Sequence, residues 1–184
     1  MKFRDAFPQD PILVPRPDLP FAGYRMQFQL LNEYRQITED GRELIVPAGY
    51  ITDGASIPRF AWSIVGGPMS RPYLYAALPH DFRYEVQGHP ETIDYVASKH
   101  PAHIENLLDP NWRERFVALI HREMDLPATR AEVDEDFRLG IGATRETWVK
   151  RQVMYRAVRI GGGGAWKGSV NKKQTPALVS SAHE

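Results

Sequence analysis

The chain has 184 residues with balanced charge: 23 Lys and Arg are matched by 23 Asp and Glu, and 42% of the residues are hydrophobic. A chain of this length and composition buries most of its surface in one compact domain, which excludes an intrinsically disordered protein. Zero net charge removes the basic surface by which many proteins hold nucleic acid, so a nucleic-acid partner is not expected. Because the chain contains no cysteine, disulfide frameworks, zinc ribbons and thiolate nucleophiles are excluded.

The N-terminal residues mix charges and prolines where a signal peptide needs an apolar run. No stretch approaches the ~20 apolar residues of a spanning helix, so we expect neither a signal peptide nor a transmembrane segment. Residues 1–23 contain five prolines and are expected to form an extended arm without regular structure. A single globular domain is expected over residues 24–166, followed by a flexible polar tail over residues 167–184.

Charge is distributed unevenly along the chain. Residues 81–136 contain thirteen acidic and six basic side chains, whereas residues 144–184 contain eight basic and two acidic ones. The simplest interpretation is that the two segments pack side by side and neutralise each other. The alternative is a cation site in the acidic segment and an anionic ligand near the basic one.

The first regular element that the pattern predicts is a β-hairpin. Residues 24–37 and 42–50 are rich in aromatic, aliphatic and threonine residues, and they flank Glu39-Asp40-Gly41, which suits a tight turn. The run from Thr52 to Pro58 then breaks regular structure.

Helices are expected in the rest of the chain. They begin near Arg71, Pro110, Thr129 and Thr144. Pro79 is expected to kink or restart the first of them just before His80, and residues 88–126 are expected to form an insertion-like segment. The run Gly161–Gly164 is expected to end the last helix. The sequence therefore predicts an α+β fold, with an N-terminal hairpin packed on a bundle of three to four helices.

The pair His80-Asp81, with Tyr84 one turn later, has the residue types of a reactive site. At i and i+4, His80 and Tyr84 share one helix face, whereas Asp81 points about 100° away. If the helix that carries Asp134 packs antiparallel to the first, the Asp134 carboxylate can orient His80 as a general base. The alternative is structural, with Tyr84 in the core and Asp134 paired with Arg138.

The loop from Asp53 to Pro58 supplies a carboxylate, a hydroxyl and a glycine that lets backbone groups turn inward. Calcium takes about six to eight oxygen ligands, so Asp53, Gly54 and Ala55, together with Asp81, are candidate calcium ligands. The structural alternative is an Asx- or Ser-capped turn. Ser56 with His80 and Asp134 also has the residue types of a nucleophile triad. The chain has no G-x-S-x-G motif, so water is the preferred nucleophile.

Four motifs follow one another along the chain: GYITDGASIPRF, AALPHDFRYE, TRAEVDEDFRLGIG and MYRAVRIGGGGAW. In this order they resemble a domain-of-unknown-function family of tailed bacteriophages and prophages. Tyr155 and Arg159 fall on pattern positions of the last motif and are further site candidates. The proline-rich start and the long segment over residues 88–126 depart from the family pattern and indicate a specialised partner contact.

The H-D-x-x-Y helix, preceded by a Gly-containing loop and followed by a D-x-x-F helix, is similar to the core of phospholipase A2. This resemblance implies that His80 activates water and that Asp134 orients it. It also implies that Asp81 and the loop from Asp53 to Ala55 hold Ca²⁺. The cysteines that brace secreted phospholipases are absent from this chain.

These resemblances predict a phage or prophage protein of the virion, tail or lysis module, located in the virion or in the cytoplasm of the infected bacterium. Its expected activity is calcium-dependent hydrolysis of a membrane lipid ester or another cell-envelope bond. Its expected partners are other virion proteins, bound through the N-terminal arm and the C-terminal tail. The alternative is a non-enzymatic component of the tail, baseplate or connector, in which the motifs serve only the fold.

Overall fold

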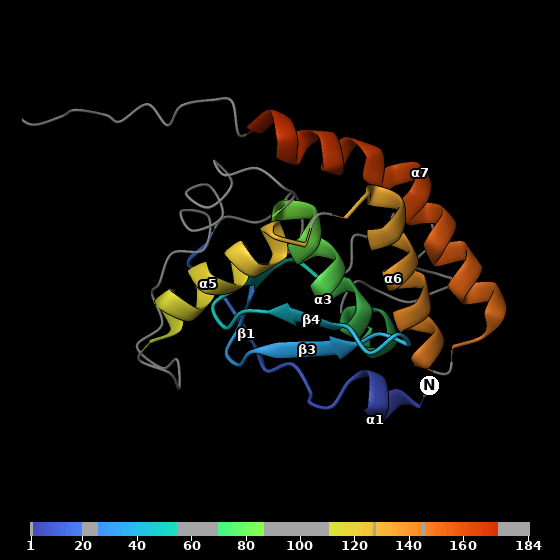
Figure 1. The fold of residues 1–184 in the computed structure, drawn as a ribbon, viewed down its shortest axis with the longest axis horizontal. Coiled ribbons are helices and arrows are strands. Elements are labelled where there is room, and N and C mark those ends of the chain that lie inside the picture. The colour runs from blue at the N-terminus through green and yellow to red at the C-terminus, as the bar shows by residue number, and fades with distance from the viewer. Residues whose placement is uncertain are drawn as a thin grey trace, which may run out of the picture.

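A computed structural model of the chain describes residues 2–19, 26–54, 70–86, 111–126, 128–144 and 146–172. After one short helix, short strands come first and longer helices follow, which confirms the predicted α+β class (Figure 1). The elements are α1 (Phe3–Ala6), β1 (Leu13–Pro15), β2 (Phe28–Leu30), β3 (Tyr34–Ile37), β4 (Glu43–Val46), β5 (Ile51–Thr52), α3 (Arg71–Val86), α5 (Trp112–Met124), α6 (Arg130–Ala143) and α7 (Trp148–Lys172).

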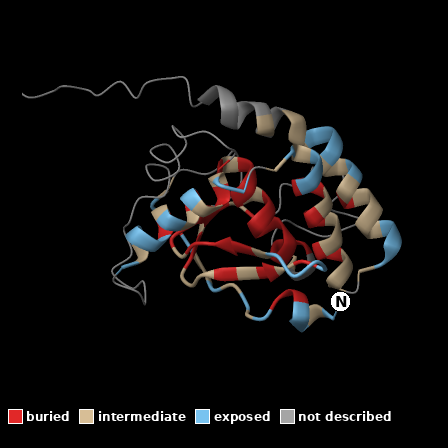
Figure 2. Ribbon diagram, in the orientation of Figure 1, coloured by how far each residue is buried: buried red, intermediate tan, exposed pale blue. Residues whose placement is uncertain are grey.

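Helix α3 lies at the centre of the molecule. It contacts the β3–β4 hairpin, α5, α6 and α7, and α6 packs between α3 and α7 (Figure 1). Apolar residues occur all around α3, a pattern typical of a helix that is enclosed by the rest of the protein. Figure 2 accordingly shows α3 almost entirely buried, and Leu78 and Phe82 are completely inaccessible to solvent.

The predicted β-hairpin is present over β3 and β4, which pair antiparallel with Tyr34 opposite Val46. Gly41 in its turn has a φ of 83°, a left-handed conformation that favours glycine. The N–H of Thr38 closes the turn by donating to the carbonyl of Arg42 at 2.9 Å.

The strand expected over residues 24–37 is interrupted, because β2 belongs to a separate antiparallel sheet of order β1-β2-β5. Asn32 lies between β2 and β3. Its side-chain amide donates to the backbone carbonyls of Asp10 at 3.2 Å and Glu33 at 3.0 Å. Side-chain bonds of this kind compete with the hydrogen bonds of a sheet and end the strand.

Part of the expected N-terminal arm has regular structure and belongs to the core. Phe7 directly follows α1, and its ring is completely buried. It lies 5.4 Å from the ring of Tyr75 and 6.4 Å from that of Tyr34, measured between centroids. Strand β1 pairs with β2. The aromatic side chains thus anchor a segment whose prolines had indicated an extended arm.

Helix α3 runs through Pro79, and the structure provides a partner for the carbonyl that this proline leaves free. Proline has no N–H, so the carbonyl of Tyr75, four residues earlier, loses its helical donor. The hydroxyl of Tyr34 donates to this carbonyl at 2.9 Å. A residue of the hairpin therefore completes the hydrogen bonding of the central helix.

Replacing Tyr34 by phenylalanine is expected to destabilise the protein by about 1–3 kcal/mol, because the Tyr75 carbonyl would stay buried without a donor. Urea unfolding followed by circular dichroism measures this loss. As a control, Tyr155→Phe removes a hydroxyl from a partly exposed residue of α7 and is expected to change stability by less than about 0.5 kcal/mol. Equal effects of the two variants would contradict this role of Tyr34.

The expected start of the third helix is confirmed, since Thr129 caps α6. The Thr129 hydroxyl accepts from the backbone N–H of Glu132, and the Glu132 carboxylate accepts from the N–H of Thr129. This reciprocal capping box satisfies two donors at the helix start.

The expectation that Gly161–Gly164 end the last helix is wrong. Helix α7 continues through this run to Lys172, and it therefore includes the beginning of the expected tail. Four glycines disfavour a helix on propensity alone. Tertiary contacts outweigh that preference here, and they belong to the site described next.

Candidate functional site

The structure brings His80 and Tyr84 of α3 together with Asp134 of α6. Nε2 of His80 lies 3.1 Å from Oδ1 of Asp134, and the hydroxyl of Tyr84 donates to the same oxygen. Arg159 of α7 donates from Nη1 to Oδ2 of Asp134 at 2.8 Å. The side chain of Asp134 is completely buried. We call these four residues, with Arg130, the Asp134 cluster.

The structural alternative for Asp134, a pair with Arg138, is wrong. Arg138 donates from Nε to Glu135 at 2.7 Å on the surface of α6. Asp134 instead faces α3, because α6 packs against that helix. Its remaining cation on α6 is Arg130, one turn earlier, whose Nε lies 3.6 Å from Oδ2.

Both ring nitrogens of His80 face carboxylates. Nδ1 lies 3.0 Å from Oδ1 of Asp81. Helix geometry alone had predicted that Asp81 points away from the face of His80. Only 7% of His80 is exposed, and its ring lies between those of Tyr84 and Phe137, at centroid distances of 4.2 and 4.9 Å.

These contacts favour a charged pair. Burial lowers the pKa of His80, but the hydrogen bonds with Asp134 and Asp81 outweigh burial and raise this pKa above its ordinary value. Burial raises the pKa of Asp134, whereas its bonds with His80, Tyr84 and Arg159 lower it overall. Relative to a free histidine and a free aspartate, these shifts favour the protonated ring of His80 paired with the ionised carboxylate of Asp134.

Gly162 and Gly163 of α7 lie directly against this cluster. A Cβ atom at Gly162 would be 2.9 Å from the Tyr84 hydroxyl, and one at Gly163 would be 3.1 Å from Nη1 of Arg130. Farther along α7, the ring of Trp166 meets that of Tyr84 edge-on at 4.9 Å. Glycine therefore lets the α7 backbone approach where any side chain would collide.

Gly162→Ala is expected to destabilise the protein by about 1–3 kcal/mol, because its methyl group would collide with Tyr84. Gly161→Ala is the matched control, since no atom lies within 4 Å of a Cβ atom at Gly161. That variant should stabilise the helix by about 0.5–1 kcal/mol. Thermal unfolding of both variants measures the difference, and equal shifts would contradict the close approach of α7.

The remaining site candidates lie as follows. Tyr155 is half-buried on α7, one helical turn before Arg159. Gly54, at the end of β5, has a φ of 85° and donates from its N–H to the hydroxyl of Thr52 at 3.0 Å. Ala55 and Ser56 lie outside the described residues.

Carboxylates from two of the expected calcium-binding segments raise the pKa of one tyrosine. Burial, followed by the charges of Glu85, Asp81 and Asp53, raises the pKa of Tyr50 well above its ordinary value. Among the residues that the structure describes, no group of three His, Cys, Asp or Glu side chains could hold a metal ion.

A second buried ionic group, which the sequence motifs did not reveal, surrounds Arg83 of α3. Arg83 lies 3.2 Å from Glu123 of α5 and 2.7 Å from Asp136 of α6. Arg42, from the hairpin, also contacts Asp136 at 3.0 Å. Arg83 and Asp136 lie three and two residues after His80 and Asp134. The sequence signal for this second ionic group was therefore that α3 and α6 each carry another ionisable residue close after His80 and Asp134.

Comparison with known protein families finds one whose sequence pattern matches this chain. The sequence pattern of the family described as "Protein of unknown function (DUF1353)" matches residues 28–158. The chain belongs to this family. The matched region of this DUF1353 protein contains all of α3 and α6, and thus His80, Tyr84 and Asp134.

The uncharacterized protein y4jT of Sinorhizobium fredii is a relative of this DUF1353 protein. The two are 40% identical over 67 residues, which are 36% of this chain and 20% of y4jT. The aligned region thus spans about a fifth of that relative's length. No solved structure matches the chain. No helix in the described ranges is both long and apolar enough to cross a membrane.

Proposed function

We propose that the protein is a hydrolase in which His80 activates a water molecule and Asp134 orients the His80 ring. The observation that carries this proposal is the 3.1 Å contact between Nε2 of His80 and Asp134, made across two helices. A buried carboxylate on one imidazole nitrogen fixes the tautomer of the ring and stabilises the imidazolium that forms when the other nitrogen takes a proton.

Proton transfer would take place at Nδ1 of His80. This nitrogen faces Oδ1 of Asp81 at 3.0 Å, so the Asp81 side chain must turn away before Nδ1 can accept a proton from water. The Asp81 side chain is 19% exposed, which leaves it room to rotate toward solvent. His80 itself would remain fixed by Asp134.

The residue types of Asp81, Asp53 and the loop that follows β5 suit a hard cation. Ca²⁺ held by Asp81, Asp53 and the backbone of Gly54 and Ala55 would polarise an ester carbonyl and stabilise the oxyanion that hydrolysis creates. The residue types and the resemblance to phospholipase A2 support this ligand set.

The proposed setting is a tailed phage or prophage, in its virion, tail or lysis module. The proposed substrate is a membrane lipid ester or another bond of the cell envelope. The order of the four motifs supports the phage setting, and the resemblance of the His80 and Asp134 helices to the core of phospholipase A2 supports the lipid ester.

Hydrolysis is tested by measuring fatty acid released from vesicles of mixed phospholipids, with calcium and with a chelator. His80→Ala is expected to lower the rate about 10²–10⁴-fold, and chelation is expected to abolish release. His121→Ala, at an exposed histidine of α5, should leave the rate unchanged. Circular dichroism of each variant controls for folding. Release that is absent from wild type, or that persists in folded His80→Ala, would overturn the proposal.

One observation favours a second candidate, a non-enzymatic component of the virion. His80 is almost wholly buried and bonded at both nitrogens, as expected of a residue that only holds helices together. Mass spectrometry of purified particles tests this candidate, since absence of the protein from virions would count against it.

A further inference from the structure

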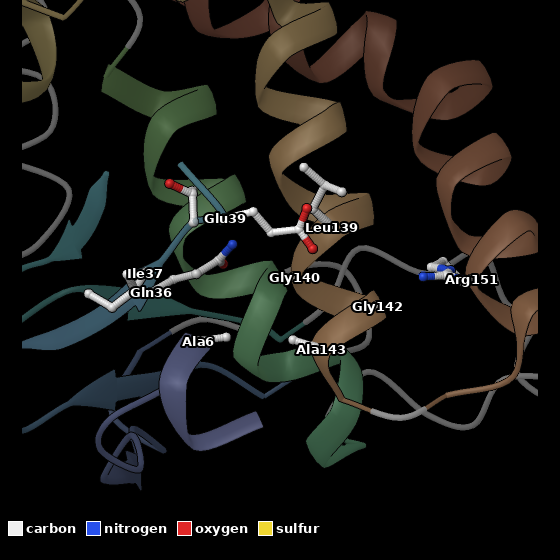
Figure 3. A pocket seen from close by; sticks show the side chains of 10 residues that line it. Ala6, Gln36, Ile37, Glu39, Leu139, Gly140, Gly142, Ala143 and Arg151 are labelled. Atoms are coloured by element: carbon white, nitrogen blue, oxygen red, sulfur yellow. The ribbon is translucent and has the colours of Figure 1, made fainter. Parts of the chain in front are cut away.

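Helix α7 packs on α6 and α3 with one face and forms an outer edge of the molecule with the other (Figure 1). Met154, on the inner face, is only 1% exposed. Figure 3 shows the Arg151 side chain extending from α7 toward Gly142 of α6. A Cβ atom at Gly142 would be 2.6 Å from Nη1 of Arg151. These contacts establish which side of α7 is turned toward the protein.

The opposite side of α7 carries apolar side chains that the protein leaves exposed. Trp148, Val149 and Ile160 are 64%, 58% and 84% exposed. They make up three of the six large hydrophobic residues that are exposed in the described parts of the chain, so exposed apolar surface is concentrated on this helix. A concentration of this kind indicates an interaction surface.

Helix periodicity places these side chains with Arg156 on one outward face. At 3.6 residues per turn, Val149, Arg156 and Ile160 lie within about 40° of one another around the axis, on the side opposite Met154. At 1.5 Å per residue, Val149 and Ile160 are roughly 16 Å apart along the axis. Trp148 directly precedes Val149. We call Trp148, Val149, Arg156 and Ile160 the outer face of α7.

Helix α7 is also strongly basic, since its sequence contains six Lys and Arg and no Asp or Glu. Arg156, between the apolar residues of the outer face, is exposed and forms no ion pair with another described residue. Helices that combine basic and apolar side chains on one exposed face are typical of proteins that bind anionic membranes.

The charge of α7 distinguishes between possible partners. In a dimer formed through this face, two helices with six basic side chains each would repel one another. A nucleic acid would bind Arg156 but would leave Val149 and Ile160 without apolar contacts. A bilayer that contains anionic lipid offers phosphates and hydrocarbon together, and tryptophan, as at position 148, is enriched at the boundary between them.

We propose that the outer face of α7 docks on a membrane surface that contains anionic lipid. The helix lies parallel to the membrane, with Val149 and Ile160 in the outer part of the hydrocarbon and the Arg156 guanidinium among the phosphates. The inner face remains packed on α6, so docking requires no unfolding. The outer face contains none of the residues proposed to act in hydrolysis, so docking does not depend on that activity.

The test measures cosedimentation of the full-length protein with vesicles. A chelator is present, so that calcium cannot connect the protein to the lipid. Vesicles of phosphatidylcholine and phosphatidylglycerol in equal parts are expected to bind the protein at least about fivefold more tightly than vesicles of phosphatidylcholine alone. Added salt should weaken this binding, because it screens the attraction between the helix and the lipid phosphates.

The double variant Val149→Gln/Ile160→Gln removes the aliphatic side chains from the outer face. It is expected to lower the affinity for mixed vesicles about tenfold or more, because the apolar contact with the hydrocarbon is lost. Ile12→Gln is the matched control, since Ile12 is 50% exposed outside α7, and it should leave the affinity unchanged. Circular dichroism checks that each variant folds.

Arg156→Glu tests the charge of the outer face and is expected to lower the affinity for mixed vesicles about fivefold or more. Arg113→Glu makes the same change at an exposed arginine of α5 and should lower it by less than about twofold, because screening limits the reach of a distant charge. Arg156→Glu also decides the question if the double variant fails to fold.

The proposal would be overturned if mixed vesicles did not sediment the protein, or if folded Val149→Gln/Ile160→Gln bound them as tightly as wild type. Self-association that this variant abolishes would assign the outer face to a second copy of the chain and would also overturn it, as would binding of a DNA duplex in place of vesicles. Because sedimentation is measured without fatty acid release, failure of docking is distinguishable from failure of the proposed hydrolysis.

Discussion

Asp134→Asn is expected to destabilise the protein by about 3–5 kcal/mol, a large fraction of the stability of a domain this size. The buried carboxylate accepts from His80, Tyr84 and Arg159. An amide in its place has one acceptor oxygen, and its NH₂ group would face a donor. The cations of the cluster would also lose their buried counter-charge.

Urea unfolding measures this loss as a lower midpoint at unchanged slope. Glu135→Gln is the matched control, since Glu135 is the next residue of α6 and its side chain is 42% exposed. Exposed ion pairs contribute little, so this control should change stability by less than about 1 kcal/mol. A similarly small effect of Asp134→Asn would show that the cluster does not hold the three helices together.

Arg83→Met is expected to lower the free energy of unfolding by a similar amount, about 3–5 kcal/mol at neutral pH. The substitution leaves the buried carboxylates of Glu123 and Asp136 without the cation that they share. Methionine preserves much of the length and packing of the side chain. Arg35→Met, at an arginine whose side chain is 40% exposed, controls for loss of a surface guanidinium and should cost less than about 1 kcal/mol.

The pH dependence of this loss distinguishes charge from packing. Burial raises the pKa of Glu123, although Arg83 acts to lower it. A group whose pKa is raised by folding contributes stability that is present at low pH and is lost as pH rises through the folded-state value. Removing Arg83 raises this pKa further. The deficit of Arg83→Met should therefore be small in acid and grow toward neutral pH, whereas a packing defect would be independent of pH.

Helix periodicity predicted the central part of the candidate site. His80 and Tyr84 are four residues apart, so a helix places them on one face, and an acidic residue on a helix that packs there must approach them. Helix periodicity did not predict where the side chain of Asp81 lies. Its side chain turns back onto Nδ1 of His80, a side-chain conformation that the direction of the Cα–Cβ bond does not determine.

Partners far apart in the sequence explain what the motifs missed. Arg83 meets Glu123 and Asp136, and Arg42 meets Asp136 across 94 residues. No local spacing connects these residues. The continuation of α7 through Gly161–Gly164 has the same origin, since glycine is a poor helix former and only contacts with α3 and α6 make it suitable there.

The glycine run also divides α7 into parts of unequal local stability. Each glycine costs about 1 kcal/mol of helix propensity relative to alanine, so the part beyond Ile160 gains little from its own backbone. It is held instead by contacts of the Asp134 cluster, including those of Gly162 and Trp166 with Tyr84. Amide protons of residues 161–166 should therefore exchange with solvent through a cooperative sub-global opening, coupled to rupture of the cluster. Any ligand or substitution that changes the charge of His80 or Asp134 would thereby also change how often the end of this helix unfolds.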